Sequence, residues 1–126
     1  MKSILELPLD EKGVALPIYA TFTGHKRLPM WAVATNSLNH KLRFFETEVE
    51  LKVIKTHRLK WSDVKSVDAQ IIWKTHNLTL NFKRTPWNFS ANVILPRYLR
   101  ESLAFLNSKG LNLTPRARQI MESITP

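Results

Sequence analysis

Alternating apolar and polar positions predict strands along most of the chain. The segment "IYATFTG" at 18–24 combines β-branched and aromatic residues with small ones, and "MWAVATNSL" at 30–38 places its larger apolar residues on one face. Shorter runs of the same kind follow, and turn-type residues separate them: 41–46, 68–74, 78–83 and 87–94. The pattern therefore predicts a succession of antiparallel strands.

The longest alternating run is "TEVELKVIKTHRLKW" at 47–61. Val49, Leu51 and Val53 alternate with charged residues, as in a strand with one buried face. The register then slips at Ile54, and the alternation resumes in a second phase. We predict one long strand with a bulge or bend near 55–57.

The period changes from two to a helical spacing after residue 95. In "LPRYLRESLAFLNSKG", Leu99, Leu103 and Leu106 recur at intervals of four and three, Pro96 suits the first helical position and Gly110 suits the end. Strands followed by such a helix indicate a mainly β (α+β) fold. We expect about seven antiparallel strands, arranged as a barrel or orthogonal sandwich that the helix caps.

Three parts of the chain follow from these elements. Residues 1–17 contain helix- and strand-breaking residues and are expected to form an N-terminal arm. Residues 18–110 form the β domain with its capping helix. Residues 111–126 are expected to hold a short final helix, with Thr114 as its N-cap and Pro115 at its first position.

Composition and charge narrow the classes of partner. The chain has 19 Lys and Arg against 10 Asp and Glu, a formal net charge of +9, and no cysteine. Residues 1–50 sum to zero charge, so the excess belongs to the second part of the chain, where it favours anionic partners; the same charge also keeps a small protein soluble. Disulfides and cysteine metal sites are excluded. Because charged residues interrupt residues 1–20, no signal peptide is predicted, and we expect a cytoplasmic protein that could lie peripheral to the membrane.

Three segments together resemble the bacterial pleckstrin-homology-like (PH/GRAM-like) domains. They are "WAVATNSLNHKLRFFE", "RLKWSDVKSVDAQI" and "LNFKRTPWNFSANV" followed by the helical segment, and the resemblance covers 18–110. It implies two near-orthogonal sheets capped by a C-terminal helix. The short element at 62–66 would then form the corner between the sheets, with Val64 and Val67 pointing into the core and Trp61 closing the edge of the corner.

The resemblance also implies a possible phosphate site, because lipid-binding members carry basic residues on their first strands. Lys26 and Arg27 lie in a predicted turn, and Lys41 and Arg43 lie on one face of a predicted strand. Ammonium and guanidinium groups on one face can hold a phosphate. Three nearby carboxylates would oppose it: Glu46, Glu48 and Glu50.

A second set of basic residues lies among tryptophans in the second part of the chain: Lys55, Arg58, Lys60, Lys74, Lys83 and Arg84. Interleaved basic and aromatic side chains can hold single-stranded nucleic acid, an anionic membrane or an acidic protein. Trp87 and Phe89 alternate within a predicted strand, and we expect both in the core.

No motif for catalysis or metal binding stands out. The histidines lack metal-ligand spacing, and the chain has too few glycines for a phosphate loop. We therefore expect no cofactor, no metal and no catalytic activity. The function predicted first is a non-catalytic PH-like interaction module that binds a protein partner or an acidic membrane surface. Two alternatives stay open: a nucleic-acid-binding protein, and a self-assembling structural protein that pairs through an edge strand at 18–23 or through the final helix.

Overall fold

The computed structural model describes residues 5, 9, 11–25, 28–36, 38–72 and 74–123, with the side chains of 25 and 28–36 excepted. Lys26 and Arg27 lie outside the described residues. The described residues form nine strands, one 3₁₀ turn and two α-helices: β1 (Val14–Ala15), β2 (Ile18–His25), β3 (Leu28–Asn36), β4 (Lys41–Phe44), β5 (Glu48–Lys52), β6 (Thr56–Lys60), η1 (Trp61–Asp63), β7 (Val64–Ile72), β8 (Thr75–Phe82), β9 (Trp87–Val93), α1 (Pro96–Ser108) and α2 (Pro115–Glu122).

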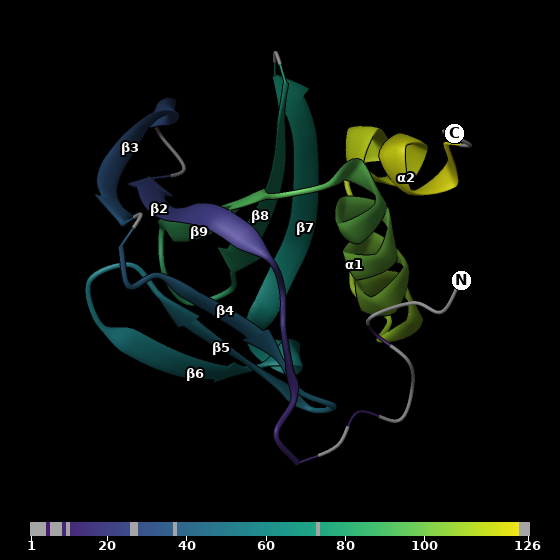
Figure 1. Cartoon of the computed structure of the whole chain (residues 1–126), viewed down its shortest axis with the longest axis horizontal. Helices are drawn as coiled ribbons and strands as arrows, with labels where there is room; N and C mark the ends of the chain where they lie inside the picture. Colours follow the sequence, from purple (N-terminus) through teal and green to yellow (C-terminus); the bar gives the residue numbers. More distant parts are fainter. Residues whose placement is uncertain are drawn as a thin grey trace.

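The strands form two separate antiparallel sheets, whose strands run in different directions in Figure 1. Their orders are β1-β4-β5-β6 and β3-β2-β9-β8-β7. A hydrogen bond joins the sheets, because the Thr21 hydroxyl on β2 donates to the carbonyl of Lys52, the last residue of β5, at 2.7 Å. The predicted mainly β, α+β class is confirmed, whereas the described strands do not close into a barrel.

The run at 47–61 is a hairpin, so the prediction of one long bent strand is wrong. β5 and β6 pair antiparallel, with Leu51 opposite His57. Val53 is buried, while Ile54 and Lys55 are exposed in the turn that joins the strands. The register slip therefore marks a reversal of the chain, and the alternation that resumes after it belongs to the returning strand.

Two further expectations about the strands are corrected. The expected turn at 75–77 is wrong, because Thr75 already pairs with Ile72 and the strand β8 starts there. β2 pairs with β9 on one side and, from Thr21 to His25, with β3 on the other, so the expected open edge is wrong for Thr21–Thr23. Self-assembly through residues 18–23 stays a prediction.

The 3₁₀ turn η1 joins β6 of one sheet to β7 of the other, so the corner is shorter than the element expected at 62–66, because residues 64–66 belong to β7. The Trp61 ring is buried, meets Phe44 edge-on at 5.3 Å and Phe105 at 5.8 Å, and its indole N–H donates to the Phe45 carbonyl at 2.8 Å. Aromatic rings in such edge-on pairs contribute beyond their buried area. The side chain of Trp61 therefore fastens the corner to β4 and α1.

Val64 and Val67 are both buried, also as predicted, although the reason differs. Both belong to β7, where residues three apart normally face opposite sides of a sheet. A register shift between Val64 and Ser66 inserts an extra residue and returns Val67 to the core side. The spacing of three thus reflects a β-bulge and not a helical turn.

Helix α1 packs along the five-stranded sheet, and it lies beside β7 in Figure 1. The predicted leucine stripe is fully buried: Leu99, Leu103 and Leu106. Gly110 ends the helix at φ 79°, with its N–H donating to the Asn107 carbonyl at 3.0 Å, and the Leu111 N–H reaches back to the Leu106 carbonyl at 3.3 Å. These two bonds form a Schellman motif, so the predicted glycine stop is confirmed.

The outer edge of β7 is covered by residues 112–114. The Val67 N–H donates to the Asn112 carbonyl at 2.8 Å, and the Thr114 N–H donates to the Val67 carbonyl at 2.9 Å. Thr114 also caps α2, as predicted, because its hydroxyl accepts from the Ala117 N–H at 3.2 Å. The chain thus supplies its own short parallel neighbour to this edge.

A carboxylate on β7 fastens that cover. Asp68 accepts from the Thr114 hydroxyl at 2.7 Å and forms a two-point ion pair with Arg116. Burial raises the pKa of the Asp68 carboxyl, but the bonds from Arg116 and Thr114 outweigh it and lower the pKa below the ordinary value. The charged form of Asp68 therefore stabilises the attachment of α2.

The N-terminal segment contributes to the four-stranded sheet. β1 pairs with β4, the Leu16 N–H donates to the Leu42 carbonyl at 2.9 Å, and the side chains of Leu5 and Leu16 are buried. The boundary of the 1–17 arm stays a prediction. No helix among the described residues has the length and apolar character needed to span a bilayer.

Candidate binding cleft between the two sheets

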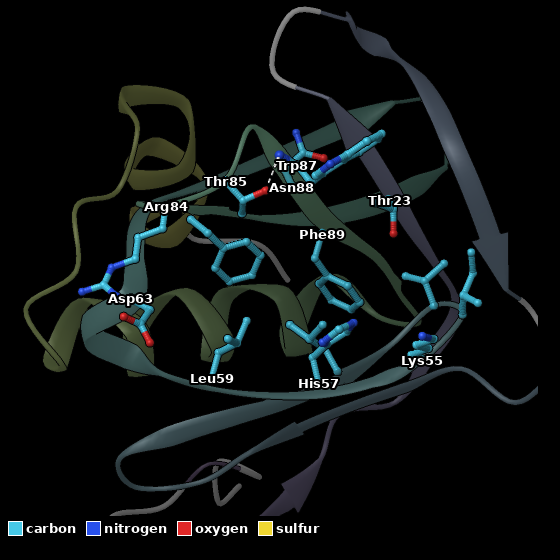
Figure 2. A pocket seen from close by; sticks show the side chains of 14 residues that line it. Thr23, Lys55, His57, Leu59, Asp63, Arg84, Thr85, Trp87, Asn88 and Phe89 are labelled. Carbon is cyan, nitrogen blue, oxygen red and sulfur yellow. Dashed lines mark hydrogen bonds between the residues drawn. The ribbon is translucent and has the colours of Figure 1, made fainter.

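An open cleft of about 750 Å³ lies between the β5–β6 hairpin and the five-stranded sheet, with α1 behind it in Figure 2. Its lining comes from segments far apart in the sequence: Thr23, Leu51, Val53, Ile54, Lys55, His57, Leu59, Asp63, Phe82, Arg84, Thr85, Trp87, Asn88 and Phe89. A volume of this size is typical of sites for small ligands or for inserted side chains.

The walls of the cleft are largely apolar. Leu51 and Leu59 come from the hairpin on one side, and Phe82 and Phe89 come from β8 and β9 on the other. Figure 2 shows Leu59 and His57 pointing from β6 into the cleft, with His57 next to Phe89. Leu51, Phe82 and Phe89 are already buried and Leu59 is half-buried. The apolar surface that an entering group could cover therefore lies mainly at Leu59 and at the exposed side chains of Ile54 and Trp87.

Cationic side chains stand at both ends of the cleft. Lys55 lies in the β5–β6 turn at one end, and Arg84 lies in the β8–β9 loop at the other, near Asp63 (Figure 2). Neither Lys55 nor Arg84 forms an ion pair with a described carboxylate. An apolar ligand that carries an anionic group would therefore find a cation without an ion pair at either end, although the Asp63 carboxylate lies near Arg84 and offsets part of its charge.

The mouth of the cleft exposes two large apolar residues. Ile54 is 74% exposed and Trp87 is 42% exposed. The expectation that Trp87 lies in the core is wrong, because β9 begins at this residue, beyond the part of the strand that faces the core; Phe89, two residues further on, is buried as predicted. Exposed aromatic residues at the rim of an apolar cleft are a common feature of binding sites.

Strand β6 borders the cleft and has a strand neighbour on one side only. It ends the order β1-β4-β5-β6, and no described strand pairs with its outer edge. The Trp61 N–H donates to the Thr47 carbonyl at 3.2 Å, so the backbone of Trp61 bonds towards the β5 side of the hairpin. The carbonyl of Glu48, which lies opposite Lys60, accepts from the Phe45 N–H and therefore faces β4 and not β6. By the alternation of antiparallel ladders, the N–H groups of Thr56, Arg58 and Lys60 point away from β5.

The structure divides the basic residues predicted as one surface. Lys55 and Arg84 both line the cleft, at its two ends. Arg58 lies on the opposite face of β6, where it pairs with Glu48 at 3.1 Å and lies over the Phe45 ring at 4.1 Å. The remaining members lie elsewhere: Lys60 ends β6, Lys83 lines a smaller hollow, and Lys74 lies in the turn at the opposite end of β8 from Arg84.

The predicted phosphate residues of β4 are already engaged. Lys41 pairs with Glu50 at 3.3 Å, and the Arg43 guanidinium donates to the Lys12 carbonyl at 2.8 Å. Glu50 lies directly opposite Arg43 on β5. A phosphate would have to compete with these contacts, so the structure gives this pair of residues no support beyond the original prediction.

The smaller hollow, of about 300 Å³, lies between η1 and the end of α1, and three lysines line it: Lys65, Lys83 and Lys109. Lys109 pairs with Glu46 at 2.7 Å, and this bond lowers the pKa of the Glu46 carboxyl. The Leu9 N–H donates to the same carboxylate at 2.8 Å. Because Lys109 already has a carboxylate partner, we place the candidate site in the larger cleft.

The polar groups of the cleft do not assemble a reactive centre. Among the described residues, His57 forms no hydrogen bond with a hydroxyl or carboxylate of the cleft, and no cluster of His, Cys, Asp and Glu could hold a metal ion. The bond that Figure 2 draws there runs from the Trp87 N–H to the Thr85 hydroxyl at 3.2 Å and shapes the β8–β9 loop. The geometry is that of a binding surface.

The chain matches no protein-family model and no curated protein in sequence. The chemistry of the cleft therefore has to be argued from its own residues. Sequence reasoning included Lys55 and Arg84 but missed Trp87, Ile54 and the open edge of β6. The slip at Ile54 was the available signal, since a turn at that position brings β6 back alongside β5.

Proposed function

We propose that this protein is a non-catalytic interaction module with a pleckstrin-homology-like fold, and that it binds a protein partner in the cleft between its sheets. The fold proposal is supported by the corner at η1 and by the closing helix α1, both of which the resemblance implied. The binding proposal rests on one observation: an apolar cleft with an unpaired cation at each end and exposed Ile54 and Trp87 at its mouth.

The shape of the charge distribution favours a protein over a flat anionic surface. Lys41 and Arg58, which face outward from the four-stranded sheet, are paired with Glu50 and Glu48. Lys55 and Arg84, which have no ion pair with a described carboxylate, instead flank a concavity that a flat membrane surface cannot enter. A protein segment can insert apolar side chains while its acidic groups meet Lys55 and Arg84.

The nucleic-acid alternative has less support. Trp61 is buried, so it offers no face for base stacking, and Lys74 lies at the far end of β8 from Arg84. A strand-binding groove needs cations and exposed rings along one path. Among the described tryptophans, only Trp87 is exposed at the cleft.

The proposal is tested with 1-anilinonaphthalene-8-sulfonate, a fluorescent apolar anion. We expect saturable one-site binding, weakened about tenfold or more when both cleft cations are reversed in Lys55→Glu/Arg84→Glu. The control Lys65→Glu/Lys74→Glu makes the same change of net charge outside the cleft and should stay within about twofold of the parent. Circular dichroism of all proteins should coincide, so that dye binding to an unfolded variant is recognised.

Two outcomes would overturn the proposal. One is the absence of saturable binding to the folded parent protein. The other is equal weakening by the cleft pair and the control pair, because the +9 charge would then act as a general field and not through a site.

A further inference from the structure

We infer that β6 receives an extended acidic peptide segment of a partner protein as an added strand, with alternate apolar side chains of that segment entering the cleft. The inference rests on the proposed function and deepens it by naming the class of partner and its mode of binding. Three independent features of β6 carry it: its open backbone edge, the alternation of its side chains and its charge.

The open edge of β6 favours a partner that has backbone hydrogen-bonding groups of its own. The N–H groups of Thr56, Arg58 and Lys60 point away from β5, and no described strand lies on that side. A peptide strand would pair with them, as in other cases of strand addition. An acyl chain could fill the apolar cleft but would leave the edge of β6 unpaired, so the edge favours a peptide over a lipid.

The side chains of β6 specify an alternating partner. His57 and Leu59 line the cleft, whereas Arg58 and Lys60 lie on the outer face of the strand. An added strand would place every second side chain over the cleft and the others beside Arg58 and Lys60. Apolar residues suit the first set of positions. Asp or Glu suits the second, chiefly beside Lys60, since Arg58 already pairs with Glu48 at 3.1 Å.

The dimensions fit a short segment. β6 has five residues, which gives roughly 17 Å of edge at the usual rise of an antiparallel strand. Two or three inward side chains would then lie above the cleft of about 750 Å³. Lys55 and Arg84, at the two ends, would meet acidic groups that flank the apolar positions.

A second copy of this chain is a poor occupant of the same edge. Pairing β6 with β6 would bring Arg58 and Lys60 of one copy close to the same residues of the other, and like charges on adjacent strands destabilise pairing. Basic side chains on an edge strand are a known protection against self-association. The same basic side chains attract an acidic strand, so they can both prevent self-association and select an acidic partner.

The first test uses the unmodified protein and a labelled peptide, acetyl-Asp-Leu-Glu-Phe-Glu-Leu-Asp-amide, in fluorescence anisotropy. We expect saturable binding, with a scrambled peptide of the same composition at least about tenfold weaker. Two further peptides carry N-methyl groups on alternate residues, one on the odd set and one on the even set. Only one set can face β6, so one peptide should lose about tenfold or more in affinity while the other stays close to the parent.

The second test removes one outward N–H from the protein. Lys60 has φ −74°, which is already close to the angle that proline requires. Lys60→Pro therefore removes the N–H without disturbing the β5–β6 ladder, and Lys60→Gln removes only the charge. We expect Lys60→Pro to weaken the peptide about tenfold more than Lys60→Gln, while both variants bind the naphthalene sulfonate as the parent does.

The outcomes separate this inference from the proposed function. Equal binding of both N-methylated peptides, equal binding of the scrambled peptide, or no difference between Lys60→Pro and Lys60→Gln would overturn strand addition. Displacement of the dye by oleate but not by the peptide would identify the cleft as a site for an acyl chain and would overturn it too. Loss of dye binding itself would overturn the proposed function.

Discussion

Strands β6 and β7 follow each other in the chain and are joined only by the 3₁₀ turn Trp61–Asp63. Their outer edges nevertheless differ in backbone pairing. The edge of β7 is covered at Val67 by residues 112–114 and fastened there through Asp68. The edge of β6 has no described strand beside it and borders the apolar cleft. An open edge is a liability for any sheet protein, and here the chain covers one edge and leaves the other open.

This difference between the two edges predicts that substitutions at β7 affect stability, whereas substitutions at β6 affect binding. At β7 the chain's own backbone, a capped helix and the partly exposed carboxylate of Asp68 hold the edge, so changes there should lower the free energy of unfolding. At β6 the exposed residues contact little of the protein, so changes there should alter binding and leave stability almost unchanged. Each prediction below tests one side of that contrast.

The largest effect is expected at Trp61, which fastens the turn between the two strands. Trp61→Ala removes the contacts with Phe44 and Phe105 and should lower the free energy of unfolding by about 3–5 kcal/mol in urea denaturation. Trp61→Phe keeps an aromatic ring but loses the bond to the Phe45 carbonyl, and it should cost less than Trp61→Ala. A cost below about 1 kcal/mol for Trp61→Ala would show that the corner is held by other contacts.

The second largest loss of unfolding free energy is expected at residues 112–114, which cover the edge of β7. Leu113 is buried where residues 112–114 meet Val67, and Leu113→Ala should cost about 2–3 kcal/mol of unfolding free energy. The matched change Ile54→Ala, at an exposed site on the mouth of the cleft, should cost less than about 0.5 kcal/mol. Equal costs for the two variants in parallel urea titrations would remove the contrast between a structural and a functional edge.

The Asp68 clamp should make part of this stability depend on pH. Bonds from Arg116 and Thr114 hold the pKa of Asp68 below its ordinary value, so the native state favours the charged carboxylate. Its contribution is fully present above the unfolded pKa of about 3.9 and is lost as the pH falls through the lower folded pKa. Asp68→Asn should cost about 1 kcal/mol at neutral pH, since the Arg116 side chain is half exposed.

Urea titrations of the parent and Asp68→Asn at several pH values check this prediction. The difference between the two proteins should shrink once the pH drops below about 3.9. A difference that stays constant from neutral to acid pH would mean that the charge of Asp68 contributes nothing and that only its shape matters.

The smallest effect on stability is expected on β6 itself. Lys60→Gln and Lys60→Pro change an exposed side chain and an outward N–H, and each should alter the free energy of unfolding by less than about 0.5 kcal/mol. Thermal denaturation of both variants against the parent checks this. A large loss for Lys60→Pro alone would mean that its N–H already has a partner within the protein.

Local signals predicted much of the fold. The leucine stripe of α1, the glycine stop at Gly110 and the Thr114 cap depend on neighbouring residues, and all three are confirmed. The burial of Val64 and Val67 was also predicted, although the bulge that causes it was not. The hairpin at Ile54 was missed because the alternation on both sides of it fits either a bent strand or a reversal.

The site was less predictable because it depends on which strands meet. Lys55 and Arg84 are far apart in the sequence, and only the β5–β6 hairpin brings them to one cleft. Trp87 has the same pattern as a core residue, and its exposure follows from its place at the start of β9. Whether an edge is open is a property of the whole sheet, so alternation within β6 could not reveal it.

The most direct measurement is amide hydrogen exchange by NMR, with and without the alternating acidic peptide. In the free protein we predict rapid exchange at Thr56, Arg58 and Lys60 and slow exchange at Val67 and Thr114, whose N–H groups are bonded across the β7 edge. Addition of the peptide should slow exchange at the three β6 amides and leave the β7 pair unchanged. Slow exchange of the three β6 amides in the free protein would contradict the assignment of β6 as the open edge. Unchanged exchange of these amides when the peptide is bound would contradict its assignment as the functional edge.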